Sequence, residues 1–246
     1  MRGVHEVIRP GDTGDLPGLR AGVDDAQLIR VARRLAEATL EIPRGPWDPR
    51  SARVTARDAF ATLLVDGLVL RELRVDGVST ALLHVAGDTV DPFARRDSLL
   101  CRDETVAWDA VEDSALALLG RRFLAAARQF PALTAALSRR QLEQSARAAR
   151  HAAVAQLPRV ERRILSLLCG LAEERGRVAV DGVTVDLPVK QAVLGQLIGA
   201  RRPTVSLALK ALAQEGLLYR RGTQWLLPHG ATGDGRPDPA PAAIAA

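Results

Sequence analysis

The spacing of apolar residues changes several times along the chain, and each change predicts a different kind of element. Residues 1–24 are rich in Gly, Pro and Asp and predict a loop. Apolar residues then recur every three or four positions: Leu28, Val31, Leu35 and Ala38. This spacing predicts an amphipathic helix over residues 25–41, which Asp24 or Asp25 can cap. Prolines and a glycine within residues 42–49 predict a connector.

From residue 60 onward, short apolar runs alternate with turn signals, as β-strands do. Asp-Gly pairs separate three of these runs: residues 61–65, 68–75 and 78–86, with Asp66–Gly67 and Asp76–Gly77 between them. Each Asp-Gly pair predicts a hairpin turn. Gly87 and Asp88 end the third run, and residues 105–119 carry further strand-like pattern with a turn near Glu112. Several strands at a spacing of about ten residues predict a small β-roll or barrel.

Helical periodicity returns after residue 120. Residues 121–128 predict a short helix, and Pro131, which suits a first helical turn, begins a long helix that runs to residue 156. One stripe of this helix has the period of a coiled coil: Leu142, Ala146, Ala149 and Ala153. Alanine allows close approach of two helices, so we expect a self-paired dimerisation helix. The alternative is a helix packed on its own domain.

Leu157 and Pro158 interrupt the helical pattern and predict a hinge between domains. An amphipathic helix is then expected over residues 160–174, and a hairpin over residues 177–187 around the Asp181–Gly182 pair.

The stretch from Gly195 to Glu215 has the spacing of a helix-turn-helix. Gly195 suits a close helix crossing, Gly199 suits a turn with positive φ, and Val205 supplies a branched side chain to bury across the crossing. Other apolar residues surround it at helical spacing: Leu194, Ile198, Leu209 and Leu212. We expect Pro188 to open the first motif helix and Gly216 to end the second. A last hairpin, residues 217–227, predicts a wing, and the Gly/Pro/Ala-rich residues 229–246 predict a disordered tail.

Composition narrows the class of protein. Apolar residues make up 47% and charged residues 26% of the 246 residues, which is typical of globular proteins. Neither a membrane-spanning run nor the apolar core of a signal peptide is found, so we expect a cytoplasmic protein. The two cysteines, Cys101 and Cys169, are far apart and belong to no Cys/His cluster, so neither a metal site nor another cofactor is predicted.

Charge is distributed unevenly. Residues 1–120 carry 15 Lys/Arg against 20 Asp/Glu, whereas residues 157–228 carry 11 against 6. The positive charge accompanies the helix-turn-helix, as a nucleic-acid surface requires. The alternative is that an arginine-rich composition alone produces such a bias.

The order of elements resembles that of the Crp/Fnr family of bacterial transcription regulators. The resemblance is most specific in the last third of the chain: Leu187-Pro188, Leu194-Gly195-Gln196-Leu197-Ile198-Gly199-Ala200, Arg202-Pro203-Thr204-Val205 and Glu215-Gly216-Leu217-Leu218. It implies an α+β fold with a cyclic-nucleotide-binding-like β-roll over residues 1–130. It also implies a dimerisation helix over residues 131–156 and a winged helix-turn-helix over residues 157–228.

The resemblance further implies a homodimer on a pseudo-palindromic double-stranded DNA site, with RNA polymerase as a further partner. The expected DNA contacts come from the motif helices and the wing: Gln191, Arg201, Arg202, Thr204, Ser206, Lys210, Arg220 and Arg221. Arg202 is the candidate to read guanine, with a phosphate clamp as its alternative role. Leu207 stands where the family often carries a polar or basic base-reading residue. An apolar side chain there can only contact a thymine methyl or pack, so the usual family operator is not assumed.

Relatives that bind cyclic nucleotides carry a Gly-Glu pair and a phosphate-binding arginine after the Gly-Asp turn. In this chain, neither counting forward from Gly87–Asp88 nor counting back from Ser98 places a Gly-Glu pair at the expected position. Glu104 stands where the phosphate-binding arginine is expected. We therefore expect a degenerate roll that does not bind cAMP or cGMP in the usual way. Arg102 could replace the arginine by a shift in register, and Arg95 with Arg96 could hold another anion. His84 is expected to be a half-buried structural histidine.

Two other classes of function are the alternatives for this sequence. No nucleophile elbow, P-loop or HExxH motif is found, and the histidines are scattered, so an enzyme is not expected. The other alternative is a winged helix that binds protein instead of DNA. The excess of Lys and Arg over Asp and Glu in residues 157–228 argues against it. A ligand-responsive regulator with a non-standard pocket also stays open.

Overall fold

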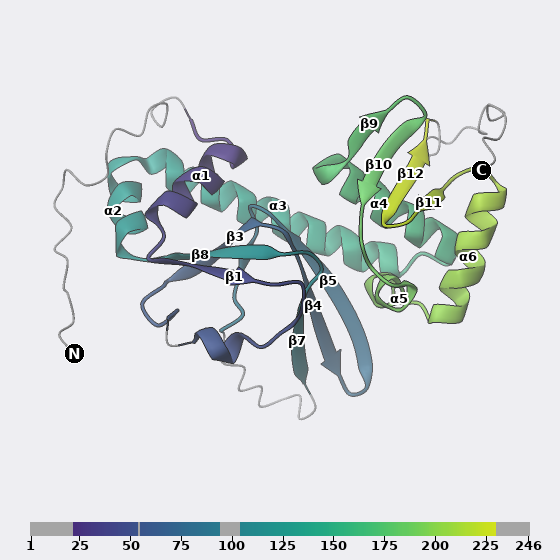
Figure 1. Cartoon of the computed structure of the whole chain (residues 1–246), viewed down its shortest axis with the longest axis horizontal. Helices are drawn as coiled ribbons and strands as arrows, with labels where there is room; N and C mark the ends of the chain where they lie inside the picture. Colours follow the sequence, from purple (N-terminus) through teal and green to yellow (C-terminus); the bar gives the residue numbers. More distant parts are fainter. Residues whose placement is uncertain (1–21, 54, 94–103, 230–246) are drawn as a thin grey trace. The chain divides into compact units, whose positions relative to one another are not determined.

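The computed structural model describes residues 22–53, 55–93 and 104–229 (Figure 1). The expected loop before residue 22 and tail after residue 229 therefore lie outside the described residues. The chain divides into two compact units, one made of Met1–Glu72 and Leu83–Ala146, the other of Leu73–Leu82 and Arg147–Ala246. The α+β class, with a β-sheet unit, a long helix and a C-terminal helix-turn-helix, is confirmed.

The first unit opens with helix α1, Asp25–Leu35. Asp24 caps it: its carboxylate accepts the backbone N–H of Gln27, and the Gln27 side chain accepts that of Asp24. The prediction of a helix as far as residue 41 is wrong. The chain turns instead into strand β1, Ala38–Ile42, which pairs antiparallel with β8, Ser114–Leu119. Over so few residues the apolar spacing of a helix and that of a strand are hard to tell apart. Pairing with β8 determines that this segment is a strand.

In the described part of the chain, strands β1 to β8 form two four-stranded sheets. The first has the order β1-β8-β3-β6 and the second β2-β7-β4-β5. The strands not yet delimited are β2 Gly45–Trp47, β3 Ala61–Asp66, β4 Leu68–Val75, β5 Val78–Val85, β6 Thr89–Val90 and β7 Thr105–Ala110. A short 3-10 helix, Pro49–Ala52, follows β2. The expected connector over residues 42–49 thus contains a strand, and Pro46 fits there because β2 is an edge strand.

The two Asp-Gly pairs play different roles. Asp76 and Gly77 have φ values of 48° and 80° and join the neighbouring strands β4 and β5, so this hairpin is confirmed. The hairpin expected at Asp66–Gly67 is wrong, because β3 and β4 belong to different sheets. Gly67 (φ 89°) forms a corner between the sheets, where a Cβ atom would stand 2.6 Å from the backbone oxygen of Asp113.

Buried side chains from both sheets share one core cluster that includes Leu64, Leu116, Val69 and Trp108. The other face of the first sheet packs on α1 and on two further helices, α2 Arg121–Gln129 and α3 Pro131–Ala155. Both helices agree with the predicted ones to within a residue. None of the helices in the described ranges is both long and apolar enough to cross a bilayer.

The second unit contains α4 Val160–Arg175, β9 Arg177–Ala179, β10 Gly182–Asp186, α5 Gln191–Ile198, α6 Arg202–Gln214, β11 Tyr219–Arg221 and β12 Gln224–Pro228. Its antiparallel sheet has the order β11-β12-β10-β9. The expectation that Pro188 opens α5 is wrong, since α5 begins at Gln191. Leu187 and Val189 are both buried around the proline, in the connection between β10 and α5.

Candidate nucleic-acid interface

Helices α5 and α6 are joined by a turn whose geometry depends on two glycines. Gly199 has a φ of 64°, the left-handed conformation that glycine adopts at little cost. The N–H of Ala200 donates to the carbonyl oxygen of Gly195 at 2.8 Å and closes the turn. A Cβ atom on Gly195 would stand 2.5 Å from the Ala200 oxygen and 3.5 Å from a methyl group of Val205. The predicted roles of both glycines are confirmed.

The crossing of the two helices is made of apolar side chains. Leu194 and Ile198 of α5 and Val205, Ala208 and Leu212 of α6 are all buried, while Leu209 is half-buried. Because these α6 residues lie on one face of the helix, its opposite face points to solvent. The packing therefore fixes which α6 residues an external partner can reach.

Most of the predicted DNA-contacting residues are exposed. On α6 and at its start these are Arg201, Arg202, Thr204, Ser206 and Lys210, while Gln191 at the start of α5 is half-buried. Helix α6 begins without a side-chain cap. Its first backbone N–H groups and its positive dipole end therefore lie beside two arginines, an arrangement suited to an anion such as phosphate.

The wing carries Arg220 and Arg221, and the structure distinguishes between them. The Arg220 guanidinium lies 4.6 Å from the centroid of the Trp225 ring and donates to the backbone oxygens of Gly222 (2.9 Å) and Val189 (3.2 Å). Arg220 thus holds the wing against the segment before α5. Arg221, on the same short strand, is exposed.

Two residues that the sequence analysis did not single out hold the end of α5. Arg163 of α4 donates through Nη1 to the backbone oxygens of Ile198 (3.2 Å) and Gly199 (3.0 Å), and through Nε to that of Leu157 (2.6 Å). The Nε2 of His151, on α3, hydrogen-bonds the oxygen of Leu197. The last carbonyls of a helix need donors, but which residues supply them depends on tertiary packing.

The four residues of the proposed dimer stripe are all exposed: Leu142, Ala146, Ala149 and Ala153. Leu142 is 72% exposed, which is unusual for a large apolar side chain in the middle of a long helix. No described part of the chain covers this stripe.

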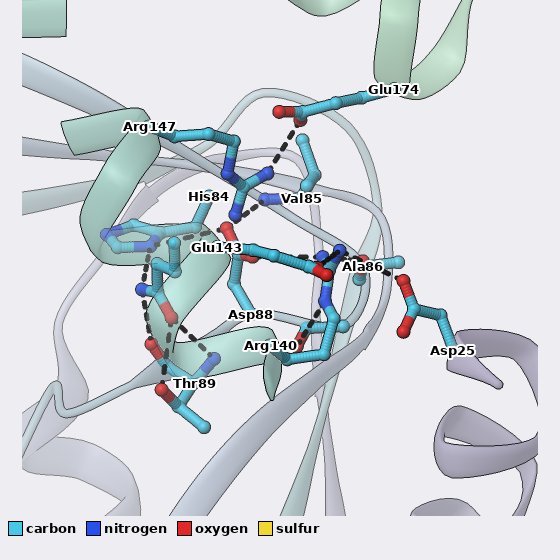
Figure 2. Close-up of polar contacts among 12 residues, drawn as sticks. Asp25, His84, Val85, Ala86, Asp88, Thr89, Arg140, Glu143, Arg147 and Glu174 are labelled. Atoms are coloured by element: carbon cyan, nitrogen blue, oxygen red, sulfur yellow. Dashed lines mark hydrogen bonds and ion pairs between the residues drawn. The ribbon is translucent and has the colours of Figure 1, made fainter. Parts of the chain in front are cut away.

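In the first unit, α3 is attached to the β5–β6 turn by Arg140 (Figure 2). Its guanidinium forms ion pairs with Asp88 (3.2 Å) and Asp25 (3.1 Å), and it donates to the backbone oxygens of Ala86 and Gly87. The Asp88 side chain is 1% exposed and that of Arg140 only 11%. A buried pair of this kind matters because removing one partner leaves a charge in a poorly solvated place.

Gln144, one helical turn after Arg140 on α3, contacts the same β5–β6 turn. Its side-chain nitrogen donates to the Thr89 oxygen at 2.8 Å and lies 3.4 Å from His84 Nδ1. His84 is 4% exposed and its ring lies 5.9 Å from that of Trp108. It is therefore more deeply buried than expected, within a polar and aromatic network of the protein itself.

Of the predicted ligand-binding residues, Arg95, Arg96 and Arg102 lie outside the described residues. Glu104 is half-buried just before β7. Within the described ranges, no group of three or more His, Cys, Asp and Glu side chains could hold a metal ion.

The second unit is thus a winged helix-turn-helix, with a basic, exposed α6 and a stacked arginine in the wing. Comparison with protein families assigns residues 162–229 to the Crp-like helix-turn-helix domain. No curated protein matches the chain.

Several solved structures share the fold. A CooA mutant from Carboxydothermus hydrogenoformans is 17% identical, with a TM-score of 0.57 over 77% of this chain and 83% of that one. FixK2 from Bradyrhizobium japonicum is 18% identical, with a TM-score of 0.55 over 77% and 91%. A transcriptional regulator of the CRP/FNR family from Thermus thermophilus is 21% identical, with a TM-score of 0.51 over 77% and 93%. The chain thus contains a Crp-like helix-turn-helix domain and shares its fold with these three structures.

Proposed function

We propose that this chain regulates transcription by binding a pseudo-palindromic DNA operator as a homodimer in the cytoplasm, and that it is not an enzyme. The observation that carries the proposal is the composition of the outward face of α6. Val205, Ala208 and Leu212 are buried, and the exposed side of the helix and its start present Arg201, Arg202 and Lys210. A helix of this charge and exposure fits the major groove, with phosphates bound at its N-terminus.

Within this interface the residues have different roles. Arg202, at the first turn of α6, reads the O6 and N7 atoms of a guanine. Arg201, Lys210 and Arg221 bind phosphates, and Gln191, Thr204 and Ser206 add hydrogen bonds to the backbone or to base edges. Arg220 donates to Gly222 and Val189, so its part is to hold the wing in place while its remaining N–H groups face the flanking DNA.

The dimer forms through the exposed stripe of α3. Leu142 supplies the large apolar side chain, and Ala146, Ala149 and Ala153 allow two helices to approach closely. Two copies related by a twofold axis place their α6 helices in successive major grooves, about 34 Å apart. Changing Leu142 to Glu should convert the dimer to a monomer in light scattering. A matched Gln141→Glu change, at an exposed position of α3 off the stripe, tests for a general effect of charge.

DNA binding is tested by selecting genomic fragments with the purified chain and measuring their affinity by fluorescence anisotropy at several salt concentrations. Three phosphate-binding residues per subunit, Arg201, Lys210 and Arg221, predict that log K falls with log salt at a slope of about −5 for the dimer. Arg201→Ala should make this slope shallower by about 2, one phosphate contact for each subunit.

The matched control is Arg177→Ala. Arg177 is exposed and basic but lies on β9, at the opposite edge of the sheet from the wing strand β11. This change should leave both affinity and slope unaltered. If no genomic fragment is retained at low salt, the DNA-binding proposal is wrong. RNA polymerase, as a partner of the DNA-bound dimer, is tested by transcription from a promoter that carries the selected site.

We further propose that binding does not require cAMP or cGMP. The proposal is supported by the missing Gly-Glu pair and by the carboxylate of Glu104 at the position expected for the phosphate-binding arginine. A carboxylate there repels a cyclic phosphate. Calorimetry should show no heat of binding with either nucleotide, and DNA affinity should be the same with and without them. Micromolar cAMP binding that is lost in Arg102→Ala would contradict this proposal.

A further inference from the structure

The middle of the outward face of α6 is apolar. Pro203, Leu207 and Lys210 are spaced four and three residues apart and so share one side of the helix, opposite the buried Val205 and Leu212. Leu207 is 70% exposed. Neither Pro203 nor Leu207 has a polar side-chain atom, so these two positions of the proposed reading surface offer no hydrogen bond to a base.

An exposed leucine between cationic residues restricts what the helix can face. If Leu207 pressed against a guanine O6 or a cytosine amino group, that polar group would lose its water without gaining a partner. The loss is worth about tenfold or more in affinity. The major-groove edge of DNA carries one apolar group, the C5-methyl of thymine. This methyl is therefore the feature that Leu207 can contact favourably.

We propose that Leu207 is a specificity-determining residue that reads a pyrimidine C5-methyl group, so that each half-site of the operator carries a thymine at one defined position. The proposal rests on the DNA-binding function proposed above. Leu207 follows Arg202 by five residues, about 7.5 Å along the helix axis. The thymine therefore lies about two base pairs from the guanine that Arg202 reads. Since 5-methylcytosine carries the same methyl group, the class of base recognised is a C5-methylated pyrimidine.

The test uses the full-length protein and duplexes selected from a random-sequence pool. Replacing the thymine by uracil removes the methyl and leaves base pairing and the other groove groups unchanged. At the position read by Leu207, uracil in one half-site should weaken binding about fourfold, the value of one buried methyl group. Uracil in both half-sites should weaken it about fifteenfold, and uracil at other thymines should have no such effect.

Three variants connect the effect to the residue. Leu207→Ala should reduce the thymine-to-uracil affinity ratio to about one, and a selection with this variant should lose the thymine preference at that position. Leu207→Met keeps an apolar side chain of similar size and should keep the ratio. Lys210→Ala, one turn away on the same face, should weaken thymine and uracil duplexes equally because it loses a phosphate contact. Since both side chains are exposed, none of the changes disturbs the packing of α6.

The outcomes separate the two proposals. If no duplex is selected, DNA binding itself fails. If duplexes are selected and bound but uracil replaces every thymine without loss, Leu207 does not read a methyl group and this inference is wrong while DNA binding stands. An unchanged thymine preference in Leu207→Ala would also overturn it. Should Leu207→Ala bind too weakly to measure, the uracil duplexes with the wild-type chain and Leu207→Met decide.

Discussion

Gly195 allows the geometry of the helix-turn-helix to be tested by adding a single methyl group. We compare Gly195→Ala in α5 with Gly170→Ala in α4, which is the same change in a helix of the same unit. At Gly170 the new Cβ atom would meet nothing within 4 Å. At Gly195 it would lie 2.5 Å from the Ala200 oxygen, a separation that Cβ atoms essentially never show.

The expected magnitudes follow from these distances. Alanine in place of glycine stabilises a helix interior by about 0.5–1 kcal/mol, and this gain applies at both positions. Gly170→Ala should therefore raise the free energy of unfolding by that amount. At Gly195 the Ala200 carbonyl must move, and overpacking of this kind costs about 1–3 kcal/mol. The free energies of unfolding of the two variants should thus differ by about 1–3 kcal/mol, with Gly195→Ala the less stable.

Urea unfolding followed by circular dichroism measures the difference. Hydrogen exchange of peptides that cover residues 187–205 then locates it. In Gly195→Ala these amides should exchange faster, because the hydrogen bond from the Ala200 N–H to the residue-195 carbonyl oxygen, which closes the turn, is disturbed. Equal stabilisation in both variants, with unchanged exchange around Ala200, would refute the argument that the close approach at Gly195 sets the turn.

Three further predictions follow from buried or helix-capping groups. Arg163→Ala should lower the free energy of unfolding by about 2–3 kcal/mol in urea unfolding, because charged hydrogen bonds to the end of α5 are lost. Arg140→Met should lower the free energy of unfolding by about 3–5 kcal/mol, because the Asp88 carboxylate stays buried after its ion-pair partner is removed. Burial, and secondly the charge of Glu173, raise the pKa of the Cys169 thiol, so alkylation by iodoacetamide should have a higher midpoint pH in the folded chain than in urea.

Controls are available for each of them. Arg162→Ala removes an exposed arginine next to Arg163 and should have little effect; equal losses in both variants would contradict the capping role. Adding Asp88→Asn to Arg140→Met should recover much of the loss, and additive losses would show that the two side chains are not coupled.

The cysteine experiment uses a Cys101→Ser background so that Cys169 alone reacts. The folded state prefers the protonated thiol, so this contribution to stability is present at neutral pH. It is lost as pH rises through the raised pKa of the folded state. Identical midpoints with and without urea would contradict the predicted shift.

Local sequence determined the helix-turn-helix to within a few residues. Gly199 adopts a positive φ and Val205 is buried against α5. Both requirements involve residues that are close together in the sequence. The long helix, strands β3, β4, β5, β7 and β8 and the Asp76–Gly77 hairpin are predictable for the same reason. Each depends on periodicity or turn chemistry within about ten residues.

Errors arose where the deciding contact is distant in sequence. Ala38–Ile42 is a strand because β8, which lies far along the chain, pairs with it. Asp66–Gly67 looks like a hairpin, but the chain passes there from one sheet to the other. The predicted start of α5 at Pro188 is wrong, since α5 begins at Gln191. The N–H of Leu187 donates instead to the carbonyl oxygen of Thr223, which lies in the wing.

The sequence alone therefore determined which residues of α6 carry charge, where the turn lies and that Leu207 is apolar. Tertiary structure decided which of them face outward, because the packing of Val205, Ala208 and Leu212 sets the rotation of the helix. It also decided that Arg163 caps α5, that Arg220 stacks on Trp225 and that Arg140 meets Asp88. Side-chain chemistry is a property of the residue, whereas exposure and partnership depend on segments that only folding brings together.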